Sequence, residues 1–300
     1  MNETFNEACS EIEGNVKPYV VSADIKILLG DWAANRGFVL PSERFFTDLR
    51  NSFTQRMIKI FPGFELVSED ELSSGIKRLI SETDSLPVSL DRVYFPCEYR
   101  IDIARLVDSQ GMDKGLGRRP GQPNLLSQFR TLRESGVESI TLVDDVVFSG
   151  DLLERVSTVA RKFGIEVTDI VAGIAIKEGV NKLKAMGVSV RAVRIYSEVV
   201  DEICERDFYP GVPFSGRQLK DIEGFGVPYM LPFGNPTKWA SIPESQQLLF
   251  SRFCLDNTIY LFSAIEEASG KIVRCSDLDR KVLDLPNNDT RFTEALKDIV

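Results

Sequence analysis

The stretch of residues 140–153, with the sequence ITLVDDVVFSGDLL, constrains the fold more than any other part of the chain. It begins with an apolar run, continues through two adjacent carboxylates, Asp144 and Asp145, and crosses a Ser-Gly turn before a helix-like pattern starts at Leu152. A run of this kind is typical of a strand that is buried in a parallel sheet. The stretch therefore predicts a strand, a loop and a helix start, the arrangement that places ligands at the carboxyl edge of an α/β sheet.

Short apolar runs alternate with amphipathic segments on both sides of this stretch. The expected strands cover residues 93–95, the run that begins near 139, and residues 167–176 and 188–195. The expected helices cover residues 101–107, 125–135, 152–163 and 180–186. Strands that alternate with helices of about ten residues imply βαβ units with right-handed crossovers. The predicted fold class is therefore α/β with a parallel sheet.

The chain before and after this alternation has a different pattern. Helical spacing of apolar residues predicts helices over 22–36, 42–60 and 68–82, and a long helix is expected over 243–267 in an otherwise loop-rich region. We therefore expect three segments: a mainly helical N-terminal extension (1–88), an α/β core (89–200) and a loop-rich and helical C-terminal region (201–300).

Composition narrows the classes of function. A formal net charge of −9 disfavours nucleic acid and anionic membrane surfaces as partners. The absence of histidine excludes Ser-His and Cys-His nucleophile pairs and histidine general bases. The five cysteines form no CxxC pair, which is typical of reduced thiols and not of a zinc site. The polar, acidic start and the lack of an apolar run near ~20 residues predict a soluble, cytoplasmic protein.

The segment LVDDVVFSG, residues 142–150, resembles the phosphoribosyl pyrophosphate (PRPP) signature of type I phosphoribosyltransferases. That signature is an apolar run, two acids, two apolar residues and a small loop. The resemblance implies a parallel sheet of the phosphoribosyltransferase type, with Asp144 and Asp145 as catalytic residues that hold the ribose hydroxyls and Mg²⁺. It also implies a cradle for the 5-phosphate, because backbone amides at a helix N-terminus favour phosphate. The cradle residues are Val147, Phe148, Ser149, Gly150, Asp151 and Leu152.

Two further segments match the order of the family along the chain. The turn at 95–100 and the glycine-rich loop at 111–123 stand where the family carries a pyrophosphate-contacting loop and a flexible hood. The implied pyrophosphate-binding residues are Arg100, Lys114, Arg118 and Arg119. The alternative for the hood is a solvated basic loop.

A third segment, RDFYPGVPFSGR at 206–217, follows the last expected strand and interleaves aromatic and charged residues. Family members use an aromatic residue in such a region to stack on the base, which implies Phe208, Tyr209 and Phe214 here. The alternative is a packed structural loop, in which these rings belong to the core.

The resemblance implies an enzyme that transfers the phosphoribosyl group from PRPP to a purine or pyrimidine with release of pyrophosphate. The partners expected are therefore small molecules, and the family makes a homodimer a reasonable expectation. Phe148, Asp151 and Leu152 depart from the hydroxyl-rich loop of the family, and Asp151 adds a carboxylate to the cradle. These departures leave a second hypothesis open, a catalytically silent protein that binds PRPP or a nucleotide in a regulatory role.

Rival interpretations of the central motif fare less well. A receiver domain of a phosphorelay also opens with a strand that ends in acids, but it needs an aspartate at the end of a later strand, and none of the expected later strands ends in one. No GxxxxGK[ST] phosphate loop is present, and no GxGxxG follows a strand. A strand that ends in two acids by chance stays open as the structural alternative.

Overall fold

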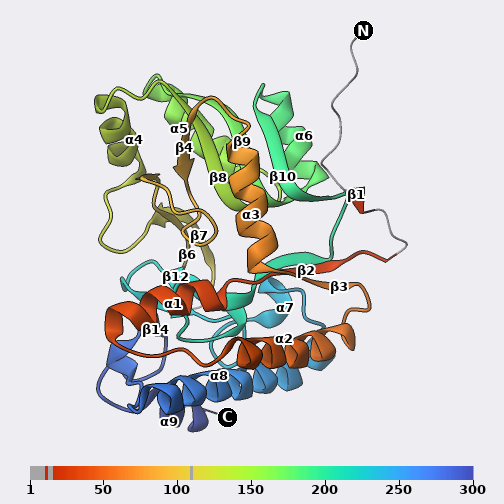
Figure 1. Cartoon of the computed structure of the whole chain (residues 1–300), viewed down its shortest axis with the longest axis vertical. Coiled ribbons are helices and arrows are strands. Elements are labelled where there is room, and N and C mark those ends of the chain that lie inside the picture. The colour runs from red at the N-terminus through yellow and green to blue at the C-terminus, as the bar shows by residue number, and fades with distance from the viewer. Residues whose placement is uncertain (1–10, 13–15, 109–110, 300) are drawn as a thin grey trace. The chain divides into compact units, whose positions relative to one another are not determined.

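The computed structural model describes residues 11–12, 16–108 and 111–299 (Figure 1). The chain forms two compact units, and both are discontinuous in sequence. Unit 1 contains residues 1–17, 69–102 and 123–199, and unit 2 contains residues 18–68, 103–122 and 200–300. Each compact unit combines segments that are distant in sequence. The three consecutive segments expected from the sequence, with borders near 88 and 200, stay a prediction.

Unit 1 is built on a six-stranded sheet in which every pair of neighbouring strands is parallel. This arrangement confirms the predicted α/β class and parallel sheet. In spatial order the strands are β1 (Glu11–Ile12), β10 (Ser189–Tyr196), β9 (Glu166–Ile176), β8 (Ser139–Val147), β4 (Leu86–Ser89) and β5 (Tyr99–Arg100).

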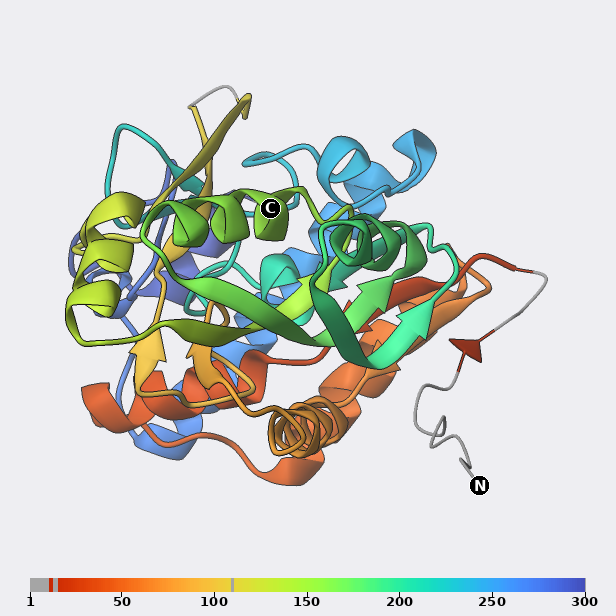
Figure 2. The same ribbon diagram turned by 90° about the horizontal axis from the view of Figure 1, so that it is seen from above.

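Helices cover both faces of this sheet (Figure 2). On one face lies α3 (Glu69–Ile80), and on the other lie α5 (Asp151–Lys162) and α6 (Lys177–Ala185), with α4 (Leu125–Glu134) beside α5. The approach of α3 is close: a Cβ atom added to Gly75 would lie 2.5 Å from Cγ2 of Val193 on β10. The central strands are therefore buried on both sides, which explains their continuous apolar sequences.

Unit 2 contains two small sheets. The first is parallel, with the order β11 (Asp201–Cys204), β2 (Tyr19–Ser22) and β3 (Phe64–Val67). The second is mixed, with the order β14 (Lys281–Val282), β13 (Phe225–Val227), β12 (Arg217–Leu219), β6 (Ile103–Val107) and β7 (Asp113–Arg118). The first 88 residues thus hold strands as well as the helices that the sequence predicts.

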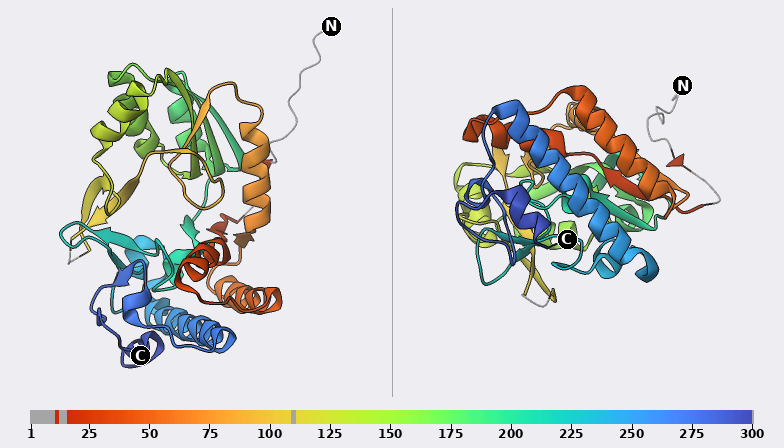
Figure 3. Two further views of the ribbon diagram at one scale, coloured as in Figure 1. Left: turned by 60° about the vertical axis from the view of Figure 1, so that its left-hand side comes forward. Right: turned by 90° about the horizontal axis from the view of Figure 1, so that it is seen from below.

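The helices of unit 2 pack through aromatic residues. They are α1 (Ile25–Arg36), α2 (Glu43–Ile58), α7 (Pro236–Trp239), α8 (Gln247–Ser269) and α9 (Phe292–Lys297), with 3-10 turns η1 (Glu205–Phe208), η2 (Glu244–Gln246) and η3 (Cys275–Asp277). Helices α2 and α8 lie side by side (Figure 3), with the rings of Phe45 and Tyr260 4.9 Å apart. By length and apolar composition, the segment Glu244–Ser269 is the one described helix that could cross a membrane, and 44% of its most apolar window is buried.

Three local predictions are wrong. Residues 93–95 form no strand, because the strand beside β8 is β4 and the chain turns directly after it. Residues 101–107 were expected as a helix, but Ile103–Val107 is β6, paired antiparallel with β7. Half of the expected loop at 111–123 is β7 itself. In the last two cases the pairing of β6 with β7 supplies backbone hydrogen bonds that local sequence cannot reveal.

Candidate functional site

The acid pair lies on β8, next to the point in the sheet where the order of the strands reverses. From β8 the chain continues to β9 and β10 on one side, whereas β4 and β5 lie on the other. The pairing of β4 with β8 ends at Val143. Asp144 and Asp145 are the next two residues of β8, so they have no β4 residue beside them. Such a switch point at the carboxyl ends of parallel strands is where open α/β sheets bind their ligands.

Asp144 is a buried carboxylate, 6% exposed, and Asp145 beside it is half-buried. One Asp144 oxygen accepts a hydrogen bond from the backbone N–H of Asp145 at 3.1 Å. Burial raises the pKa of Asp144 well above its ordinary value, and the nearby charges of Asp145 and Asp91 raise it further. A cation or hydroxyl donor at this place would favour the ionised form and lower that pKa again.

Sequence reasoning did not single out Asp91, the third acid of this group. It lies two residues after the end of β4, is 4% exposed, and accepts hydrogen bonds from the N–H groups of Val93 (3.0 Å) and Tyr94 (2.8 Å). These bonds close the turn after β4, which places Asp91 at the same edge of the sheet as Asp144. The available signal was an acid two residues after the short segment LPVS, which forms β4 and pairs with β8.

Arg100 lies at this edge as well. Ser89 of β4 is level with Val143 of β8 on one side and with Arg100 of β5 on the other. Since neighbouring strands are about 4.8 Å apart, the Cα atom of Arg100 lies roughly 10 Å from that of Val143. The side chain is exposed. Arg100 is thus the one predicted pyrophosphate residue that belongs to the same unit as the acid pair.

The expected phosphate cradle forms the turn between β8 and α5. Val147 ends the strand, Phe148 is 37% exposed, and Gly150 precedes the helix with a φ of 79°. This left-handed conformation is one that glycine adopts without strain. The N-cap residue of α5 is Gly150, which has no side chain to cap the helix, and Asp151 and Leu152 are its first two residues. The Ser149 hydroxyl oxygen accepts a hydrogen bond from the Asp151 backbone N–H at 3.4 Å. The amides that follow in the first turn are those that a helix N-terminus offers to an anion.

Helix α6 presses against this turn through Gly179. A Cβ atom at that position would lie 2.9 Å from Cγ1 of Val147 and 3.0 Å from the backbone nitrogen of Gly150. Both distances are shorter than ordinary van der Waals contact. The absence of a side chain at Gly179 therefore lets α6 hold the turn in place.

Two contacts engage the carboxylate of Asp151. Its Oδ2 accepts a hydrogen bond from the Ser149 hydroxyl at 2.7 Å, and its Oδ1 pairs with the ammonium group of Lys182 on α6. Lys182 also pairs with Glu154 at 2.7 Å. The pKa of Asp151 is lowered by the hydrogen bond from Lys182 and then by that from Ser149, so this carboxylate is ionised at neutral pH.

The other predicted cations belong to unit 2, where each has a contact. Lys114 pairs with Asp108 at 2.8 Å, and Arg118 pairs with Glu223 at 2.7 Å. The guanidinium of Arg119 lies 4.9 Å from the ring centroid of Phe214. Their role toward pyrophosphate stays a prediction, and so does the alternative of a solvated basic segment, half of which the structure shows as the strand β7.

Two of the three predicted base-binding rings are core residues. Phe208 and Tyr209 are 0% and 1% exposed, and the Phe208 ring packs 5.4 Å from Phe53 and 5.3 Å from Phe250. Rings buried in this way have no face open to solvent, which fits the alternative of a packed structural loop for both, and their contact with a base stays a prediction. Phe214 is half-buried and, unusually for a non-glycine residue, has a φ of 62°.

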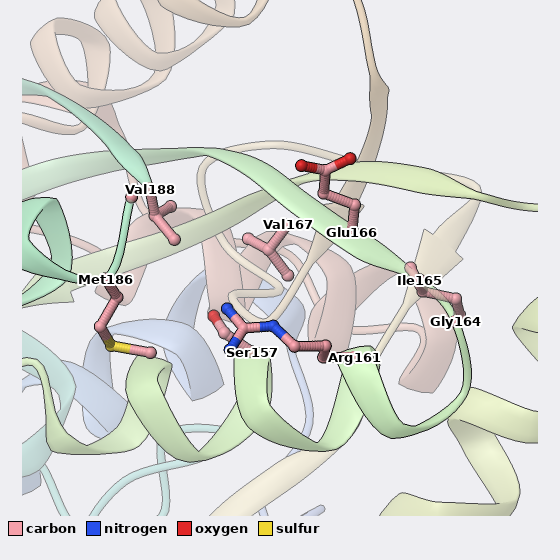
Figure 4. A pocket seen from close by; sticks show the side chains of 9 residues that line it. Ser157, Arg161, Gly164, Ile165, Glu166, Val167, Met186 and Val188 are labelled. Carbon is pink, nitrogen blue, oxygen red and sulfur yellow. The ribbon is translucent and has the colours of Figure 1, made fainter.

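A separate pocket of about 280 Å³ lies in unit 1 at the amino ends of β9 and β10 (Figure 4). Ser157 and Arg161 of α5 line it together with Met186 and Val188. The side chains of Ser157 and Arg161 point into the middle of the pocket. None of the predicted site residues lines this pocket. It opens at the opposite ends of the strands from Asp144.

The acid pair fits Mg²⁺ by the chemistry of its donors. Among residues 11–12, 16–108 and 111–299, no group of three or more His, Cys, Asp or Glu side chains converges as a protein-only metal site. Mg²⁺ usually binds through one or two carboxylates and completes its shell with water and substrate oxygens. Asp144 and Asp145 offer such an incomplete set.

Comparison with known proteins gives structural likeness only. No family model matches the chain. No curated protein matches it. Among solved structures, it is similar to Mycobacterium tuberculosis orotate phosphoribosyltransferase in complex with PRPP, at 12% identity and a TM-score of 0.26 over 41% of this chain and 70% of that one. Adenine phosphoribosyltransferase from Rhodothermus marinus matches at 14% identity and a TM-score of 0.26, over 41% of this chain and 77% of that one.

A third match, Leishmania donovani UMP synthase, has 12% identity and a TM-score of 0.26 over 42% of this chain. The chain spans only 27% of that protein. TM-scores this low carry no argument about function. The proposals below therefore rest on the acid pair and the turn after it.

Proposed function

We propose that this chain is a cytoplasmic phosphoribosyltransferase that transfers the 5-phosphoribosyl group from PRPP to a purine or pyrimidine and releases pyrophosphate. The observation that carries the proposal is the sequence of elements at the end of β8. A buried carboxylate, Asp144, stands beside a half-buried one, Asp145, and six residues after Asp145 the helix α5 begins at Asp151, with Gly150 as its N-cap residue. Hydroxyl acceptors and a helix start that can bind a phosphate are thus joined by one short turn.

In this proposal Asp144 and Asp145 accept hydrogen bonds from the two ribose hydroxyls, and the amides at the start of α5 bind the 5-phosphate. The same two carboxylates would hold Mg²⁺, which supplies neutralisation of the pyrophosphate charge when bound. Arg100 at the same sheet edge is the cation placed to help. Lys114, Arg118 and Arg119 remain candidates for pyrophosphate, and Phe214 for the base.

The chemistry assigned to the protein is positioning and charge stabilisation. The chain has no histidine, and the resemblance implies a transition state with oxocarbenium character that needs no protein nucleophile. Holding the sugar by its hydroxyls and phosphate fixes the anomeric carbon relative to the incoming base, which lowers the entropic part of the barrier. Fixed positive groups stabilise the departing anion.

A second candidate is a catalytically silent protein that binds PRPP or a nucleotide in a regulatory role. One contact favours it: the Ser149 hydroxyl, the single hydroxyl of the turn at 148–152, donates a hydrogen bond to the Asp151 carboxylate within the turn itself. A cradle with fewer donors fits binding better than fast turnover. In either role the expected partners are small molecules, with a homodimer as the family-based expectation.

Calorimetric titration with PRPP and Mg²⁺ tests both candidates against a structural role for the acids. We expect saturable binding by the wild type and none by the double variant Asp144→Asn, Asp145→Asn with an unchanged far-UV circular dichroism spectrum. Retained affinity in the double variant would remove the acids from the site. With binding established, release of pyrophosphate in the presence of a panel of purine and pyrimidine bases separates the enzyme from the silent binder.

A further inference from the structure

The carboxylate of Asp151 creates a difficulty for a phosphate ligand, because it stands on the first residue of the helix whose amides would bind that phosphate. An ionised acid there repels a dianion. The side chain is also exposed, with no burial to keep it protonated, and the contacts with Lys182 and Ser149 lower its pKa. A phosphate would therefore meet Asp151 in its charged form.

Lys182 is placed to offset this charge. It projects from α6, a different helix from α5, and its ammonium group pairs with Asp151 and, at 2.7 Å, with Glu154 one turn further along α5. Both partners raise the pKa of Lys182, so the ammonium group stays charged over the physiological range. The three side chains together carry one net negative charge, and without Lys182 they would carry two.

The same contacts fix the direction of Asp151. Lys182 binds Oδ1 while the Ser149 hydroxyl donates to Oδ2 at 2.7 Å, so each oxygen has a partner. Gly179, in the first turn of α6, packs closely against the backbone of the loop at 148–150. A Cβ atom added to Gly179 would lie 3.0 Å from the Gly150 nitrogen. One helix thus fixes both the backbone of the cradle and the charge beside it.

We propose that Lys182 is a positioning residue that makes the turn at 148–152 able to accept a phosphate, by holding the Asp151 carboxylate aside and offsetting its charge. This inference rests on the proposed function, since it names how that same site tolerates its acidic residue. It assigns a role to a residue that the sequence motif does not include. In this proposal the positive charge of Lys182 on α6 compensates the negative charge that Asp151 adds to the turn.

The test is a set of titrations with ribose 5-phosphate without metal, and with PRPP plus Mg²⁺. We expect Lys182→Met to weaken both ligands about tenfold, less at high salt because these groups are exposed and screened. Lys182→Arg keeps the charge and should retain most of the affinity. Lys184→Met, an exposed lysine on the same helix, is the matched control and should bind as the wild type does.

The decisive arm is the double variant Asp151→Asn, Lys182→Met. Because the acid that Lys182 offsets is gone, its affinity should return to the wild-type value or exceed it, and Asp151→Asn alone should bind at least as tightly as the wild type. A lysine with only a structural role would give no such rescue. Lys182→Met binding like the wild type, or a double variant as weak as Lys182→Met, overturns the inference while the proposed function stands.

The two proposals fail in different ways. If the wild type binds neither ligand, the proposed function falls, and the inference falls with it. If the wild type binds both and the acid-pair variant binds neither, the function stands whatever the lysine series shows. Melting temperatures of all variants identify any loss of affinity that comes from unfolding.

Discussion

At the scale of single residues, the buried carboxylate of Asp144 has a cost in stability. Buried carboxylates are usually paired with a cation, whereas Asp144 is 6% exposed and the charged neighbours that raise its pKa, Asp145 and Asp91, are also acids. Burial and like charge both favour the protonated form in the folded protein. Residues held at such a cost are typical of functional sites.

We predict that Asp144→Asn raises the stability of the protein at neutral pH. Because the folded-state pKa of Asp144 is raised, the folded protein binds a proton that the unfolded chain releases, and stability falls as pH rises from the ordinary aspartate pKa through the raised one. The asparagine variant lacks this loss. Its melting temperature should match the wild type near pH 4 and exceed it at pH 8, by about 2–4 °C for each ~1 kcal/mol.

The control for that prediction is Glu166→Gln, an exposed acid at the start of the neighbouring strand β9. It should change the melting temperature little at either pH. An Asp144→Asn variant that is less stable than the wild type at both pH values would show that the carboxylate is not strained by burial in the way described.

At the scale of elements, the turn between β8 and α5 depends on a helix that follows it in sequence. Helix α6 reaches the turn because Gly179 has no side chain to separate them. The sequence around 148–152 therefore does not define the cradle by itself. The geometry of its amides is set by packing between α5 and α6.

We predict that Gly179→Ala weakens ligand binding and lowers stability. The added methyl group would lie within 3.0 Å of the Gly150 nitrogen and 2.9 Å of Val147, so the turn or α6 must shift. Overpacking of this kind costs roughly 1–3 kcal/mol. Chemical denaturation and titration with ribose 5-phosphate measure the two effects.

Gly30→Ala provides the contrast for Gly179→Ala. Gly30 lies within α1, and nothing is within 4 Å of an added Cβ. Alanine favours a helix over glycine by up to about 1 kcal/mol, so this substitution should be neutral or stabilising. Equal destabilisation by both substitutions would argue against a specific contact between α6 and the turn.

At the scale of the whole molecule, the chain passes from one compact unit to the other several times, so each unit is built from three separate segments. Residues 103–122 leave unit 1 after Asp102 and return at Pro123. The Gln128 side-chain amide donates to the carbonyl oxygen of Asp102 at 3.1 Å and to that of Pro123 at 2.8 Å, so the two ends of this excursion lie close together. Unit 1 can therefore be closed without the segment.

We predict that residues 69–199 fold independently when a short Gly-Ser linker replaces 103–122. This polypeptide keeps α3 and the five strands β4, β5, β8, β9 and β10. A cooperative thermal transition and dispersed amide resonances would support the prediction. Residues 89–200 alone lose α3 and almost all of β4, the neighbour of β8, and should not fold cooperatively. The reverse pattern would contradict the division into units.

The sequence by itself determined the parallel α/β core and the position of the acid pair. The apolar runs of β8, β9 and β10 are continuous because both faces are buried, and this signal is local and strong. Asp144 and Asp145 were found for the same reason, since charge at the end of such a run has few structural explanations. The turn at 148–150 and the start of α5 followed from one glycine and the helical spacing after it.

Only the tertiary structure decided the features that depend on contacts between distant segments. The strand β6, expected as a helix, exists because β7 pairs with it, and Phe208 and Tyr209 are core residues because Phe53 and Phe250 pack near Phe208. Asp91 joined the acid pair through the pairing of β4 with β8, and Lys182 met Asp151 through the packing of α6 on α5. Burial and charge pairing are properties of three-dimensional neighbours, and single-sequence patterns record only neighbours along the chain.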